Sequence, residues 1–460
     1  MIAGLKPYPQ YKESGLPWLG KVPGHWGQRR MKSLFKERVQ KGFPDEPLLA
    51  ATQTKGVVRK EDYGPRTVTA SKDLHLLKLV EIGDFVISLR SFQGGIEIAH
   101  CRGIISPAYT ILAPRSEANQ SYYSRFFKSP DFISSLTLFV TGIREGQNID
   151  YARLSRVYMP LPPAEEQASI GRFLDWANGR LEGAIRAKRK VIRLLNEQKR
   201  AIIHRAVTRG LEPNVALKPS GVPWFGDIPK HWNVMRAKYL YREVDERSSD
   251  GTEELLSVSH ITGVTPRSQK NITMFKAASY VGHKLCRPGD LVVNTMWAWM
   301  GALGVSTYAG IISSSYAVYR PHRPNGIVGI YMDGLLRSRP YISNIICRST
   351  GLHSSRLRLY PEEFLRLPLV QPPPEEQQRI GQAIQAETAD LNTAISRLER
   401  EIELLLEYRT RLVADVVTGK LDVREAAARL PEAAAVDVIT ETDDAELTDE
   451  ADSNDEEVVA

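Results

Sequence analysis

The chain carries the same peptide twice. SGLPWLGKVPGHW begins at Ser14 and SGVPWFGDIPKHW begins at Ser220, 206 residues later, and each copy holds two Trp and two Pro. This spacing is too long for a solenoid repeat, whose units have about 20 to 50 residues. It indicates a duplicated domain. We therefore expect two copies of one fold, and a duplicated target for them to bind.

The duplication extends over nearly the whole chain. Further segments match in the same order, and both copies end alike, with VTRGL at Val207 and VTGKL at Val417. The other matching pairs are GDFVIS and GDLVVN, RGIISPAYTILAP and AGIISSSYAVYRP, VTGIREGQNIDY and STGLHSSRLRLY, and PLPPAEEQASIGRFL and LVQPPPEEQQRIGQAI. The shared segments are the framework of the fold. Segments that differ are candidates for different binding preferences.

Each copy begins with a globular domain, over residues 14–160 and 214–369. Short apolar runs in these stretches, such as DFVISL and IISSSYAVY, have the β-branched composition of strands. We predict two domains of mixed α/β (α+β) structure.

A long helix follows each globular domain. Ala164–Val207 and Pro374–Val417 have two Glu in the first turn and contain no Pro beyond the first residue. Pro and Glu at the start of such a stretch are helix-entry signals. With their flanking residues, the first helix and its linker cover residues 161–213, and the second helix covers residues 370–425.

The apolar residues of both helices follow a heptad repeat, which predicts that the helices pack together as a coiled coil. The first helix leads from one domain to the other, and the second must run back, so the pair is predicted to be antiparallel. Two independent surface helices are the alternative. The seam positions are Leu181, Ile185, Lys188, Ile192, Leu195, Lys199 and Ile202, with Leu391, Ile395, Leu398, Ile402, Leu405, Arg409 and Leu412.

The charge is unevenly distributed. Residues 432–460 contain 12 acidic residues and no Lys or Arg, whereas the remaining chain has 61 basic and 42 acidic residues, a net charge of +19. A body this basic favours a polyanion as partner, most simply nucleic acid, although a basic surface without such a partner is the alternative. The acidic tail, residues 431–460, is predicted to be disordered.

Several classes of function are not supported by any motif. The chain has no GxxxxGK[ST] phosphate-binding loop, no Asn/Asp-Pro-Pro-aromatic tetrapeptide and no acidic nuclease signature. Its three cysteines, Cys101, Cys286 and Cys347, are scattered, which argues against a disulfide framework and against a zinc site. It has no apolar run of membrane-spanning length. We therefore predict a cytoplasmic protein with no catalytic residues, no metal site and no membrane partner.

The repeated motifs resemble those of the specificity (S) subunit of type I restriction-modification enzymes. The resemblance is carried by SGLPWLGKVPGHW, GIISPAYTILAP, TGIREGQNIDY and PLPPAEEQASIGRFL together with their second-copy counterparts, and it covers about residues 4–425. The acidic tail lies outside the family pattern.

This resemblance implies a function and a set of partners. In that family each globular part is a target recognition domain that reads one half of a split double-stranded DNA sequence. The helices set the gap between the halves and dock two methyltransferase (M) subunits, and restriction (R) subunits join the complex. The S subunit itself binds no cofactor; S-adenosylmethionine, ATP and magnesium are expected in the partner subunits.

Two loops in each domain are the predicted DNA-binding face, because their polar residues differ between the copies. Arg suits guanine, and Asn or Gln suits adenine. Each such residue could instead contact a phosphate or only solvent, and Trp297 could be a packing residue. The candidates in the first copy are Arg90, Ser91, Gln93, Arg144, Gln147 and Asn148; those in the second are Asn294, Thr295, Trp297, His353, Ser354, Ser355, Arg356 and Arg358.

Two other functions remain open from the sequence. One is an enzyme with an unfamiliar site. The other is a coiled-coil scaffold that binds RNA, or DNA without sequence preference. Neither explains why a shared framework carries different polar loops.

Overall fold

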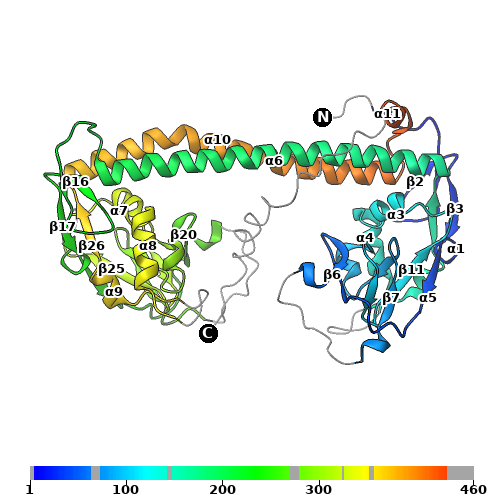
Figure 1. Cartoon of the computed structure of the whole chain (residues 1–460), viewed down its shortest axis with the longest axis horizontal. Helices are drawn as coiled ribbons and strands as arrows, with labels where there is room; N and C mark the ends of the chain where they lie inside the picture. Colours follow the sequence, from blue (N-terminus) through cyan, green and yellow to red (C-terminus); the bar gives the residue numbers. More distant parts are fainter. Residues whose placement is uncertain are drawn as a thin grey trace. The chain divides into compact units, whose positions relative to one another are not determined.

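The computed structural model describes residues 5–63, 73–141, 148–269, 279–323, 326–351 and 357–431. The chain forms two compact units (Figure 1): the first combines Met1–Ala187 with Glu401–Ala460, and the second is Lys188–Arg400. The acidic tail lies outside the described residues from position 432 onward.

Both long helices predicted from the sequence are confirmed. They are α6 (Ala164–Arg209), which ends two residues later than predicted, and α10 (Pro374–Val417), which has the predicted bounds. Each helix contributes one part to the first unit and the other part to the second unit.

The first unit is built on a four-stranded antiparallel sheet with the order β4-β11-β8-β9. Its strands are β4 (Phe35–Arg38), β8 (Phe85–Ile87), β9 (Glu97–Ile98) and β11 (Thr110–Pro114). Two-stranded sheets pair β1 (Tyr11–Glu13) with β2 (Lys21–Pro23), β3 (Gly27–Arg30) with β14 (Tyr158–Leu161), β5 (Leu49–Thr52) with β6 (Gly56–Arg59), β7 (Lys78–Val80) with β10 (Gly103–Ile105), and β12 (Val140–Thr141) with β13 (Asn148–Ile149).

The second unit repeats this topology. Its four-stranded sheet has the order β18-β25-β22-β23, formed by β18 (Tyr241–Val244), β22 (Leu291–Val293), β23 (Leu303–Val305) and β25 (Ala317–Pro321). Its two-stranded sheets pair β15 (Leu217–Pro219) with β16 (Asp227–Pro229), β17 (Asn233–Arg236) with β26 (Pro368–Gln371), β19 (Leu256–Ser259) with β20 (Gly263–Pro266), and β21 (Lys284–Cys286) with β24 (Gly310–Ile312). The sequence duplication is therefore a duplication of fold.

The central strand of each sheet is buried on both faces. In β8, Phe85 and Ile87 belong to one hydrophobic core and Val86 belongs to another. In β22, Leu291 and Val293 likewise face one core while Val292 faces a second. Successive side chains of a strand point to opposite faces, so a strand between two cores has an unbroken apolar sequence.

Short helices cover the larger core of each unit. In the first unit these are α1 (Met31–Leu34), α2 (Ser91–Gly94), α3 (Gln120–Phe126), α4 (Pro130–Leu136) and α5 (Tyr151–Leu154). In the second unit they are α7 (Gly329–Leu336), α8 (Arg339–Arg348) and α9 (Pro361–Leu365). After α10, α11 (Arg424–Ala428) packs on the first unit through Ala427.

The SGxPWxG…HW peptide is a packing element in both units. The side chains of Trp26 and Trp232 are fully buried, each in the larger core of its unit. The peptide therefore packs each domain, as predicted for a segment of the shared framework.

A Glu near the start of each long helix contacts this peptide through its carboxylate. Glu166 accepts hydrogen bonds from Tyr8 Oη at 2.6 Å and Trp26 Nε1 at 2.8 Å, and its other oxygen lies 2.7 Å from His25 Nε2. Glu376, its equivalent in α10, lies 2.7 Å from His231 Nε2. Trp232 Nε1, by contrast, is buried and has no hydrogen-bond partner among the described residues. The Glu of the first unit therefore binds more of the buried hydrogen-bond donors around it than the Glu of the second unit does.

The Gln that follows each of these Glu residues explains the shared EEQ sequence. Gln167 donates from Nε2 to the carbonyl of Pro162 at 2.8 Å and accepts from Asn119 N at 3.0 Å. Gln377 repeats both contacts, donating to Pro372 O at 2.9 Å and accepting from the backbone N–H of the second unit's α7 N-cap at 3.0 Å. Each Gln therefore joins the start of a long helix to a short helix of its own domain.

Within each unit, α6 and α10 run in opposite directions. In the first unit Glu182 lies 3.5 Å from Arg409, and Ile170, nearer the start of α6, shares a core with Val417 at the end of α10. In the second unit Lys199 Nζ donates to Asn392 Oδ1 at 2.7 Å, while Val207 shares a core with residues nearer the start of α10. None of the 14 predicted seam residues is classed as exposed.

Chain segments from both termini meet in the first unit. Lys6 forms an antiparallel bridge with Asp422, and Tyr11 Oη donates to Lys420 O at 3.1 Å. The Arg424 guanidinium lies 5.2 Å from the centre of the Tyr8 ring. In the second unit, the continuous chain that follows the end of α6 takes the place of these two terminal segments.

Candidate nucleic-acid interface

The strand that leads to the first predicted loop is fixed in both units by a buried Asp. Asp84 accepts from Arg38 at 2.7 and 3.2 Å, and Asp290 accepts from Arg320 at 2.9 Å twice. Arg320 also donates to Glu246 at 2.7 Å, and these bonds, chiefly that to Asp290, raise the pKa of its guanidinium. The two Arg lie on non-equivalent strands, β4 and β25, yet each pairs with the Asp at the equivalent position of its unit.

In the first unit the loop after β8 presents two exposed polar side chains. Ser91 is 1% exposed, and its Oγ accepts from Ser88 N at 2.9 Å. Ser91 therefore stabilises the turn, while Arg90 and Gln93 are exposed on either side of it. The turn ends at Gly95, which has φ +84°, and a Cβ there would lie 2.2 Å from a backbone oxygen of Phe127.

In the second unit the equivalent loop carries aromatic side chains. Asn294 is 2% exposed and its Oδ1 accepts from Met296 N at 3.2 Å, so it stabilises this turn. Trp297 and Trp299, both partly exposed, stack with ring centres 5.9 Å apart and an interplanar angle of 20°. Trp299 Nε1 donates to Met296 O at 2.9 Å, while no described residue accepts from Trp297 Nε1. Thr295, also partly exposed, donates to Ser315 O at 2.9 Å.

The second predicted loop lies mostly outside the described residues. This applies to Arg144 and Gln147 in the first unit and to His353, Ser354, Ser355 and Arg356 in the second. Asn148, at the end of the first-unit loop, is exposed and faces Thr141 across the β12–β13 pair.

The structure brings the two predicted loops of the second unit together. Leu359 N donates to Thr295 O at 2.9 Å, and the exposed Arg358 places Nη2 3.6 Å from Met296 Sδ. The segment that carries Arg358 thus lies beside the loop that carries Thr295 and Trp297. Among the described residues of the first unit, no hydrogen bond joins the Arg90 loop to Asn148.

A cation that supports the Arg90 loop was not predicted. Lys128 follows α3 and donates through Nζ to Gly94 O at 2.8 Å and to the carboxylate of Glu97, which is 3% exposed in its side chain. Burial raises the pKa of Glu97, and Lys128 opposes that shift. Lys128 therefore ties the end of α2, and with it the Arg90 loop, to the body of the domain.

Arg337 occupies the matching position in the second unit. Its guanidinium donates to the carbonyls of Ser259 and His260, at the tip of the β19–β20 hairpin. The acid near it is Asp333 on α7, and burial raises the pKa of that carboxyl to about 6. Aligning FFKSPDFIS with LLRSRPYIS in the two copies would have revealed this repeated cation.

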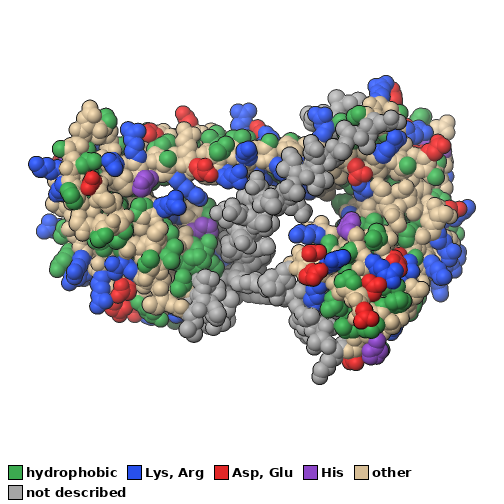
Figure 2. Space-filling view, viewed as in Figure 1, with side chains coloured by type: hydrophobic (Ala, Val, Ile, Leu, Met, Phe, Trp, Pro, Cys, Tyr) green, Lys and Arg blue, Asp and Glu red, His purple; other side chains and the backbone are tan. Residues whose placement is uncertain are grey.

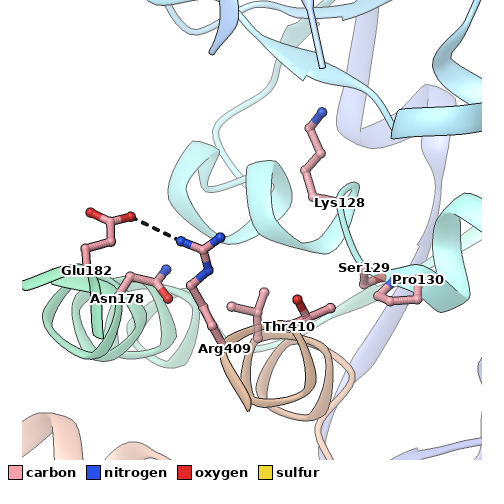
Figure 3. Close-up of a pocket in the computed structure, with 8 residues that line it drawn as sticks. Lys128, Ser129, Pro130, Asn178, Glu182, Arg409 and Thr410 are labelled. Carbon is pink, nitrogen blue, oxygen red and sulfur yellow. Dashed lines mark ion pairs between the residues drawn. The ribbon is translucent and has the colours of Figure 1, made fainter. Parts of the chain in front are cut away.

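A small cavity in the first unit lies where α4 approaches both long helices (Figure 3). Its volume is about 210 Å³, and Asn178 Oδ1 beside it is buried and accepts no hydrogen bond from the part of the chain that the structure describes. Figure 3 shows Arg409 pointing toward Glu182, while Lys128 points away from both helices. The lining residues are Lys128, Ser129, Pro130, Asn178, Glu182, Arg409, Thr410 and Val413.

The described residues do not point to other kinds of site. They contain no group of three or more His, Cys, Asp or Glu side chains that could hold a metal ion. Within the same residues, no helix is long and apolar enough to cross a bilayer.

Comparisons with known proteins agree with the resemblance seen in the motifs. No protein-family model matches the chain. The putative type I restriction enzyme MjaX specificity subunit of Methanocaldococcus jannaschii is 22% identical over 443 residues, which cover 88% of this chain and 96% of that protein. The MjaVIII specificity subunit of the same organism is 30% identical over 141 residues, covering 30% of each chain.

One solved structure shares the fold. It comes from work on the complex assembly and conformational transition of the type I R-M system, and it superposes with a TM-score of 0.54 at 16% sequence identity. The match covers 87% of this chain and 99% of that one. The resemblance to type I specificity subunits, read first from the repeated motifs, is thus confirmed along most of the chain.

Proposed function

We propose that this chain is the DNA-binding specificity subunit of a type I restriction-modification complex. Each unit reads one half of a split DNA target, and the two halves differ in sequence. The observation that carries this proposal is the repeated fold with unlike loops. The same strand order leads to Arg90 and Gln93 in the first unit but to Thr295 and Trp297 in the second.

The exposed loop residues supply chemistry suited to bases. Arg90 and Arg358 offer two parallel N–H donors to a guanine edge, and Gln93 and Asn148 can form paired hydrogen bonds with adenine. Trp297 offers an apolar face that packs against a thymine methyl group or the sugar. Ser91 and Asn294 contribute by holding the turns. The remaining predicted contacts, at Arg144, Gln147 and residues 353–356, belong to the same two loops.

The long helices act as the spacer between the two readers. We infer an antiparallel coiled coil, supported by the opposite directions of α6 and α10 within each unit. A 46-residue helix is about 69 Å long, or about two turns of DNA. The spacer would set the length of the gap between the half-sites.

Catalysis belongs to the partners in this proposal. Two M subunits dock on the helices, R subunits join them, and the complex methylates adenine or cleaves DNA. S-adenosylmethionine, ATP and magnesium serve those subunits, and this chain carries none of them. The complex acts in the cytoplasm.

Mapping of methylated adenines tests the proposal. DNA from cells that express the chain with its cognate methyltransferase subunit is expected to carry N6-methyladenine at one split motif. DNA from cells with the methyltransferase subunit alone is the control and should lack this motif. Methylation without a split motif, despite a stable complex, would instead favour a scaffold that binds nucleic acid without sequence preference.

A further inference from the structure

One face of α6 carries three Arg side chains in the second unit. Arg189, Arg193 and Arg200 are all exposed. None of the three has an acidic partner among the described residues. Figure 2 shows Lys and Arg side chains along the stretch that Figure 1 labels α6. These three residues are called the Arg stripe below.

The Arg stripe shares its side of the helix with residues that pack against the recognition domain. At about 100° per residue, Arg193 and Arg200 lie about 40° and 20° from Arg189 around the helix axis. On the same basis Ile203 and Val207 lie within about 40° of Arg189, and both are next to Gly334 of α7. The Arg stripe therefore lies on the same side of α6 as the residues that contact this domain.

The other faces of this part of α6 are used differently. The seam residues Lys188, Leu195 and Lys199 lie about 80° to 120° away from Arg189, toward α10. The exposed apolar residues Val191 and Leu194 lie about 140° to 160° away, nearly opposite the Arg stripe. An apolar exposed face suits a protein partner, whereas an unpaired cationic face suits a polyanion.

The stripe is absent from the second helix. The repeat-equivalent positions in α10, 210 residues later, are Glu399, Glu403 and Thr410. Overall α6 has 11 Lys and Arg with 5 Asp and Glu, whereas α10 has 5 and 9. The duplicated framework does not require this charge, so a function specific to α6 explains it better than the fold does.

We propose that the Arg stripe binds the phosphate backbone of the DNA that follows the half-site read by the second unit. This inference rests on the proposed function. Arg189 and Arg200 are about 17 Å apart along the helix, which matches about five base pairs of duplex. Phosphate contacts are independent of sequence. The stripe therefore increases the affinity for the DNA between the half-sites without recognising its bases. Because α10 lacks the stripe, we expect these phosphate contacts only beside the half-site that the second unit reads.

The test is the salt dependence of DNA binding by the complex of the full chain with its methyltransferase subunits. The variant Arg189→Gln/Arg193→Gln/Arg200→Gln keeps residues that favour helix. Each lost phosphate contact lowers the slope of log K against log salt by about 0.9, so three contacts correspond to about 2.7. Between 50 and 200 mM salt, the wild-type complex should then lose about 40-fold more affinity than the variant loses.

A control variant removes the same charge from other faces of α6. Lys190→Gln/Arg205→Gln/Arg209→Gln changes three exposed residues that lie about 100° to 200° from Arg189, and it should keep the wild-type slope. Equal slopes for both triple variants would overturn the proposal. Loss of methyltransferase subunits from the stripe variant, with an unchanged slope, would overturn it in favour of a protein-binding face.

The outcome is separable from that of the proposed function. Slopes are measured on the split target and on unrelated duplex of equal length. The stripe predicts a reduced slope on both, because phosphate contacts occur on any sequence. The proposed function predicts tighter binding to the target than to unrelated duplex. Equal affinity for the two duplexes would contradict the proposed function while leaving the slope comparison valid.

Discussion

Replacing Glu166 with Ala is expected to destabilise the first unit by about 2 to 6 kcal/mol, because the change leaves buried donors without an acceptor. The Glu166 side chain is 4% exposed, and its carboxylate serves Tyr8 Oη, Trp26 Nε1 and His25 Nε2. Neither Tyr8 nor Trp26 can turn to water, since they are 3% and 0% exposed. Scanning calorimetry should show the unfolding temperature of this unit lowered by about 10 °C.

The repeat supplies a matched control for this substitution. Glu376 occupies the same helix position in the second unit, but the one described side chain that pairs with it is His231, which is 48% exposed and can be rehydrated. Glu376→Ala should therefore cost about 1 kcal/mol or less. Both variants lose the same favourable charge near a helix start, so that effect cancels. Equal shifts for Glu166→Ala and Glu376→Ala would show that the buried donors contribute little.

Replacing Arg320 with Met is expected to destabilise the second unit by about 3 to 5 kcal/mol. Asp290 is 2% exposed and accepts two hydrogen bonds from Arg320, so the substitution leaves a buried carboxylate without its cation. Met retains most of the aliphatic volume, which limits the loss of packing. Asp290 immediately precedes β22, and β22 leads to Thr295 and Trp297. Hydrogen exchange should therefore increase in this loop before it increases in α8.

The control for Arg320 is a neighbouring surface cation. Arg287 is 62% exposed and pairs at 2.8 Å with Glu246, which is itself 38% exposed. Exposed pairs of this kind contribute about 1 kcal/mol or less, so Arg287→Met should leave the unfolding temperature nearly unchanged. A similar small effect for Arg320→Met would contradict the claim that Arg320 stabilises the buried Asp290.

Much of the fold could be predicted because two kinds of pattern were present in the sequence. The heptads of α6 and α10 come from residues whose burial repeats with the helix, and α10 has the bounds that its entry signals and its lack of internal Pro predict. The repeated peptides identified framework positions such as Trp26 and Trp232. The duplicated strand order followed from the duplication itself.

The candidate site was less predictable, because loop roles depend on contacts between distant segments. The polarity of Ser91 and Asn294 predicts contacts with DNA, but both residues are buried and hold turns. Arg38 and Arg320 come from non-equivalent strands, yet each pairs with the Asp at the equivalent position of its own unit. An alignment of the two copies therefore does not place the two Arg residues together. No local pattern indicates that Arg358 lies next to Met296.

Methylation mapping after exchange of one globular domain tests whether each unit reads its own half-site. Residues 220–368 would be replaced by the corresponding segment of a type I specificity subunit with a known target. If each unit reads its own half-site, one half of the methylated motif changes, while the other half and the gap length stay as they were. A change in both halves, or in neither, would contradict the claim that each unit reads its own half-site.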